Sequence, residues 1–147
     1  SSLQCGLAGW ALAFVGAKGA EALKEAAKSD SQKVRASAIA ALAEQIQTSN
    51  DKNARDLVKD ALQDSSDEVQ IEAIKLTHLL LENELDYELI NDKLKDKNPE
   101  IRKQAAILLI KLDATQLVNN LNDLLVKEND ASVAAVIKLA IKRLRKN

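Results

Sequence analysis

Residues 34–42 read VRASAIAAL, and three later stretches repeat the same pattern. These are VQIEAIKL at 69–76, IRKQAAILL at 101–109 and VAAVIKLAI at 133–141. They begin 35, 32 and 32 residues apart. Each starts with a β-branched residue and has alanine or an aliphatic residue four and seven positions later, which is one face of a helix with about 3.6 residues per turn. The sequence therefore predicts four related amphipathic helices, which we call B helices.

A second helical pattern, which we call the A helix, precedes each B helix. The A helices are GAEALKEAAK at 19–28, ARDLVKDALQ at 54–63, DYELINDKLK at 86–95 and TQLVNNLNDLLVK at 115–127. The A and B helices are joined by short links rich in Ser, Asp and Asn, which cap helix N-termini. Pro99 stands where a first helical turn accepts it. Links of this length predict antiparallel helical hairpins.

A hairpin with one apolar face per helix buries that face by stacking on the next hairpin, so the repeat predicts an all-α fold, an α-α superhelix or solenoid. We expect about four and a half hairpins in one domain over 1–147, as part of a longer solenoid. Residues 3–16 fit a B helix without an A helix, and their wide apolar surface predicts either more solenoid, a partner or a second copy. The predicted units are 3–16 (half), 17–48, 52–83, 86–113 and 114–146.

The stretch WALAFVGAKGAEALKEAAKSDSQKVRASAIAALAE at 10–44 resembles the HEAT and HEAT-like repeat family, in particular its short phycocyanobilin-lyase type. The third unit repeats the pattern with DKNPEIRKQAAILLIKLD at 96–113, and the resemblance covers the whole chain. Gln70 and Ala134 stand where the family favours Arg, and Asp113 stands where Gly often closes a unit. The resemblance implies the solenoid fold and, for most members, a role as scaffold or adaptor.

Composition excludes several kinds of site. The net charge of −1 disfavours a general nucleic-acid binder, which needs an excess of Lys and Arg. With only Cys5 and His78 the chain cannot form the usual zinc cages, and Cys5 has no base close in sequence. We therefore expect no metal, no cofactor and no catalytic residue. Residues 3–17 are too short to span a bilayer, so we expect no membrane contact and a cytoplasmic location.

These observations lead to the prediction of a non-enzymatic protein–protein interaction scaffold or adaptor that binds another protein on a concave face of B helices. Candidate partner-binding residues are Arg35, Gln70, Arg102 and Lys103 on the B helices, with Trp10 and Phe14 available for self-association. Two alternatives stay open: a nucleic-acid-associated protein with a local basic groove, and a lyase or other enzyme subunit. The acidic run over 82–92 is predicted to be a solvated turn.

Overall fold

The computed structural model describes residues 18–145, which form helices and turns without a β-strand. The A helices are a helix over 18–26, α4 (Lys52–Ala61), α6 (Tyr87–Lys93) and α8 (Val118–Lys127). The B helices are α2 with α3 (Gln32–Ala41, Ala43–Ser49), α5 (Asp67–Leu76), α7 (Pro99–Leu112) and α9 (Ala131–Arg145). The predicted all-α class and the order of A and B helices are confirmed, and the predicted half-unit 3–16 lies outside the described residues.

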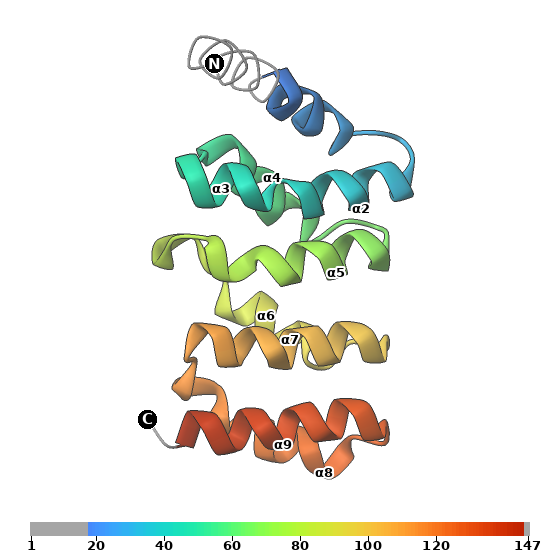
Figure 1. The fold of residues 1–147 in the computed structure, drawn as a ribbon. Coiled ribbons are helices and arrows are strands. Elements are labelled where there is room, and N and C mark those ends of the chain that lie inside the picture. The colour runs from blue at the N-terminus through green and yellow to red at the C-terminus, as the bar shows by residue number, and fades with distance from the viewer. Residues whose placement is uncertain (1–17, 146–147) are drawn as a thin grey trace, which may run out of the picture.

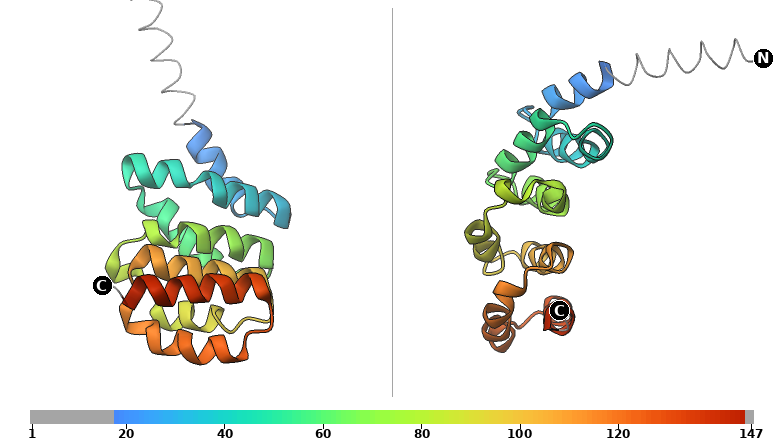
Figure 2. Two further views of the ribbon diagram at one scale, coloured as in Figure 1. Left: turned by 60° about the horizontal axis from the view of Figure 1, so that its bottom comes forward. Right: turned by 90° about the vertical axis from the view of Figure 1, so that its left-hand side faces the viewer.

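The helices are arranged in two layers. Figure 1 shows the B helices one above another in front, with α4, α6 and α8 behind them. The B helices contact one another in chain order, α2 on α5, α5 on α7 and α7 on α9. The column bends gently so that the B helices lie on the inner side of the curve (Figure 2). The chain is therefore an α-solenoid of stacked helical hairpins.

Local sequence explains where the B helices begin. The side chains of Ser31, Ser66, Asn98 and Asp130 each accept a hydrogen bond from a free N–H of the first helical turn. This is the capping role predicted for the links, and it fixes the start of each B helix within its unit. Pro99 occupies the first turn of α7, where its missing N–H needs no partner.

Small residues allow the B helices to approach one another. Ala38, Ala73 and Ala105 occupy equivalent positions and are almost completely buried, as is Ile137 in the last unit. Because interiors are close-packed, these positions fix how far apart neighbouring hairpins lie. No helix within 18–145 is both long enough and apolar enough to cross a membrane.

The ends of the B helices differ between units. α3 and α7 end at Asn50 and Asp113, both in the left-handed conformation with φ of 50° and 53°. In the second unit α5 instead tightens into the short 3-10 helix η1 (Thr77–Leu79), where Thr77 donates a hydrogen bond to the carbonyl of Ala73. A longer connection then follows, with η2 (Glu82–Glu84) before α6; in the next unit η3 (Thr115–Leu117) precedes α8.

Candidate functional site

Arginines at the start of two B helices join successive hairpins. Arg35 donates from Nε and Nη2 to both carboxylate oxygens of Asp64 in the next unit, at 3.0 Å each. Arg102 makes the same paired contact with Glu128, at 2.8 Å each. The remaining nitrogen of each arginine donates to backbone carbonyls of its own A–B link. Each guanidinium therefore fixes the link of its own hairpin to the link of the next.

The junction between the second and third units uses other chemistry. Gln70 occupies the position of these arginines and donates to the carbonyl of Asp64 at 2.6 Å. The amine of Lys93, at the end of α6, donates to the side-chain oxygen of Gln70 at 2.8 Å. Lys93 is only 7% exposed, and burial lowers its pKa, although the negative charges of Asp96, Asp67 and Asp92 act in the opposite direction. A partly desolvated amine thus replaces an ion pair at this junction.

The predicted partner-binding residues have different surroundings in the structure. The polar groups of Arg35, Gln70 and Arg102 are engaged within the chain at the junctions. Lys103 is partly exposed, with its amine 3.9 Å from Glu100 on the same helix. Trp10 and Phe14 lie outside the described residues.

A groove between the third and fourth units carries an excess of positive charge. We call it the basic groove; it has a volume of about 530 Å³ and lies between the C-terminal end of α6, the two A–B links and the end of α8. It contains four basic and two acidic side chains over an apolar floor. Its lining residues are Leu94, Lys95, Asp96, Lys97, Arg102, Leu124, Lys127, Glu128 and Asn129.

The acidic groups of the basic groove already have donors. Asp96 accepts a hydrogen bond from the N–H of Asn98, and Glu128 accepts from Arg102 and from the N–H of Asp130. The hydrogen bonds from Arg102 hold the pKa of Glu128 below its usual range, although burial acts against this. The exposed amines of Lys95, Lys97 and Lys127 are left to face a ligand, so the groove suits an anion with apolar surface.

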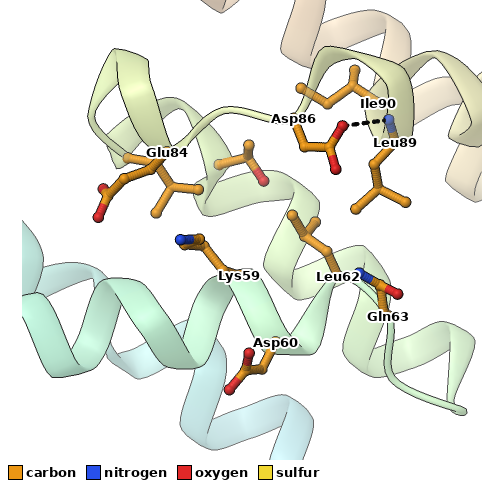
Figure 3. A pocket seen from close by; sticks show the side chains of 10 residues that line it. Lys59, Asp60, Leu62, Gln63, Glu84, Asp86, Leu89 and Ile90 are labelled. Carbon is orange, nitrogen blue, oxygen red and sulfur yellow. Dashed lines mark hydrogen bonds between the residues drawn. The ribbon is translucent and has the colours of Figure 1, made fainter.

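A second groove, between the second and third units, has the opposite charge. We call it the acidic groove; its volume is about 390 Å³. Figure 3 shows Lys59 of α4, and Leu62 directly after α4, on the side of the segment that carries Glu84 and Asp86. The residues that line this groove include one lysine, Lys59, and three acidic residues, because Asp60 also belongs to the lining. This surface repels an anion that the basic groove would attract.

The acidic run that forms this groove is more ordered than predicted. Glu84 was expected in a solvated turn, but its carboxylate is largely buried and lies 2.9 Å from the guanidinium of Arg55, 29 residues earlier. Glu84 also accepts from the N–H of Leu81, and Asp86 accepts from the N–H of Leu89 at 2.9 and 3.0 Å respectively. The prediction was wrong for Glu84 because its partner comes from the preceding unit.

The basic groove was not predicted from the sequence, although the sequence shows the acidic residues that lie beside it. An acidic residue stands five positions before the first residue of three of the repeated B-helix stretches: Asp64, Asp96 and Glu128. The sequence therefore shows the carboxylates of the junctions between units. The lysines belong to two A–B regions about 30 residues apart, and only the stacking of units brings them together. Within 18–145 no three His, Cys, Asp or Glu side chains are grouped so as to hold a metal ion.

The fold and its grooves define a helical-repeat protein of the α-solenoid class. A family model described as a family of unknown function, DUF5724, matches residues 14–145, and the chain belongs to this family. The chain is also similar to the bilin biosynthesis protein MpeU of Synechococcus sp. (strain WH8020), with 34% identity over 147 residues. The match covers 100% of this chain and 50% of MpeU, so the chain spans about half the length of this relative.

This relative overturns two predictions. The interpretation of the chain as a non-enzymatic protein-interaction scaffold or adaptor is wrong, and so is the prediction that it is not an enzyme, because the relative is named for a biosynthetic role. The error has a physical origin. The repeat pattern reflects how the hairpins stack. The residues that stack recur in every unit whether or not the surface binds a ligand or catalyses a reaction.

Proposed function

We propose that this chain is the bilin-binding part of an enzyme of bilin lyase type, built from short HEAT-like repeats. The observation that carries the proposal is the similarity to a bilin biosynthesis protein along the entire chain. Residues 10–44 and 96–113, which lie within this alignment, also resemble the phycocyanobilin-lyase type of repeat, in agreement with the proposal.

The basic groove is the surface on the described residues that best matches such a ligand. A bilin is an open-chain tetrapyrrole with a flat, largely apolar conjugated system and two propionate groups, which are ionised at neutral pH. The groove offers an apolar floor at Leu94 and Leu124 and exposed amines at Lys95, Lys97 and Lys127. We infer that the amines bind the propionates while the leucines contact the pyrrole rings.

Charge, and not rigid support, favours the basic groove over the acidic one, because each groove has an ion pair in its wall. Glu84 of the acidic groove pairs with Arg55, and the Arg102–Glu128 pair of the basic groove fixes the third and fourth hairpins relative to each other. A ligand that spans both hairpins therefore meets lysines from two hairpins that are already joined before binding. The chain's own contribution would be to bind and orient the bilin.

The test is a titration of the purified chain with biliverdin, followed by the absorption change of the pigment. Lys95→Glu with Lys127→Glu should weaken binding by about tenfold or more, which corresponds to about 1.4 kcal/mol. Lys59→Glu in the acidic groove is the matched control and should leave the dissociation constant unchanged. All three lysines are exposed, so none of these changes should unfold the chain.

A second ligand makes the test specific for the propionates. Biliverdin dimethyl ester keeps the conjugated system but carries no negative charge, so it should bind the wild-type chain more weakly and should not distinguish the lysine variants from it. Equal affinity for acid and ester, or equal loss in the Lys59→Glu control, would show that the basic groove does not hold the propionates.

A further inference from the structure

The N-terminal edge of the column exposes a residue that the other units bury. Val34 is 44% exposed, whereas its counterparts Val69, Ile101 and Val133 are at most 1% exposed. In the later units a preceding hairpin lies against this position, as α2 lies against α5. The first described hairpin therefore presents a packing face that is open.

This edge is also hollowed. A groove of about 330 Å³ lies between the helix over 18–26 and α2, lined by Leu23, Ala26, Lys33, Val34, Ser37 and Ala38. Apart from Lys33, its lining is small or aliphatic. Alanine and serine side chains allow the backbone of another helix to approach closely, and interaxial distances of about 8–10 Å depend on such residues. We call this surface the N-terminal groove.

The opposite edge of the column has different chemistry. α9 has Ala134 where Arg35 and Arg102 stand, so it lacks the arginine that would reach a following link. Lys138 and Lys142 are exposed on α9 at positions where earlier B helices carry Ile74 and Ile110. Leu139 is exposed there too. A polar edge of this kind is typical of the end of a solenoid, so the two edges are not equivalent.

We propose that residues 3–16 bind in the N-terminal groove as one more B helix and stack on α2 as α2 stacks on α5. Leu3, Leu7, Trp10 and Phe14 are spaced by four, three and four residues, which places them on one helical face. The segment has 14 residues, the same number as α7. It therefore has the length and the apolar face of a B helix.

The connection that this arrangement needs already exists elsewhere in the chain. α3 and α4 are joined by only Asn50 and Asp51, with Asn50 in the left-handed conformation. In the proposed arrangement Gly16 and Ala17 would form a link of the same length, and glycine adopts positive φ without a steric cost. The segment can thus reach the groove through the turn used between the first and second units.

Trp10 is the single tryptophan of the chain and reports directly on this contact. If the segment is bound, Trp10 fluorescence should be shifted to shorter wavelength and protected from acrylamide relative to the urea-unfolded chain. Val34→Glu places a charge in the N-terminal groove and should move both readings toward their unfolded values. Because Val34 is exposed, the rest of the column should keep its helical circular dichroism.

The control substitution lies at the other edge. Leu139 is 42% exposed, nearly the same as Val34, so Leu139→Glu adds the same charge at a similar site without touching the groove. It should leave Trp10 fluorescence unchanged. An unfolded-like Trp10 in the wild-type chain, or a blue-shifted signal that Val34→Glu does not alter, would overturn the proposal. A blue shift that disappears on dilution as light scattering shows a dimer dissociating would also overturn it, since the occupant would then be a second copy.

Discussion

Within residues 18–145 the three junctions between hairpins have a common geometry but two kinds of chemistry. At the first and third junctions an arginine joins its own link to a carboxylate of the next unit, Arg35 to Asp64 and Arg102 to Glu128. At the middle junction Gln70 holds its own link in the same way, but it meets the amine of Lys93 instead of a carboxylate. Asp96, the carboxylate equivalent to Asp64, caps the N–H of Asn98 just as Asp64 caps the N–H of Ser66.

This difference bears on how firmly each pair of hairpins is fixed. A guanidinium fork makes two parallel bonds to a carboxylate and so restricts the angle between units as well as their distance. The contact between Lys93 and Gln70 is a single bond, and the free energy of desolvating the amine opposes it. The middle junction therefore lacks the guanidinium fork between links and depends on other contacts across it, the Arg55–Glu84 ion pair and the hydrogen bond from Asn98 to Asp67. The acidic groove lies at this junction and the basic groove at the firmly joined third one.

Of the substitutions at the junctions, removal of Arg102 should lower the free energy of unfolding most. In Arg102→Met the carboxylate of Glu128, whose side chain is 5% exposed, keeps only the backbone N–H groups of Asn129 and Asp130 as donors. A charge left without its partner in such a site should cost about 2 kcal/mol of unfolding free energy. Urea unfolding followed by circular dichroism measures this loss.

A surface ion pair provides the control for that experiment. Lys52 and Asp56 lie 2.8 Å apart on α4 and are both exposed. Lys52→Met should produce no measurable change, because solvent screens such pairs. If Arg102→Met proves as mild as Lys52→Met, the arginine contacts do not distinguish the third junction from the middle one.

Introduction of an arginine–carboxylate contact at the middle junction should raise the free energy of unfolding, by less than the loss of Arg102 lowers it. Gln70→Arg combined with Lys93→Met supplies the missing guanidinium opposite Asp96 and removes the desolvated amine. We expect a gain of about 1 kcal/mol in unfolding free energy. The single variant Lys93→Met should give part of this gain. A double variant less stable than wild type would mean that the helix spacing at this junction does not admit an arginine.

The repeat pattern predicted the architecture because the fold depends on local signals that recur. Helical spacing, capping residues in the links and alanine at the close-packed position are all read within one unit. The junction contacts are harder to predict. Arg35 and Arg102 were predicted to bind a partner, and nothing within one unit shows that a carboxylate of the same chain lies 26 to 29 residues away.

The candidate site was less predictable than the fold for the same reason. Lys95, Lys97 and Lys127 resemble ordinary solvated charges in the sequence, and the net charge of −1 gives no hint of a basic groove. Stacking places them around Leu94 and Leu124. The substitution of Gln70 for arginine was visible, but its partner Lys93 was not, since that contact depends on how α6 ends.

The smallest expected effect is on the pH dependence of the unfolding free energy, which should differ between the two kinds of junction. Hydrogen bonds from Arg102 lower the folded-state pKa of Glu128 below 4.5, so its contribution is complete above that pH and is lost as pH falls through the lowered value. The stability difference between wild type and Arg102→Met should therefore shrink in acid.

For Lys93 burial lowers the folded-state pKa below 10.5. At pH values between the folded-state pKa and the unfolded-state pKa, the unfolded chain binds more protons than the folded chain. Wild type should therefore gain stability relative to Lys93→Met as pH rises through this window. Urea midpoints of the three proteins across acid and alkaline pH measure both differences; a constant gap between wild type and Lys93→Met at alkaline pH would mean that the amine is as well solvated in the fold as in the unfolded chain.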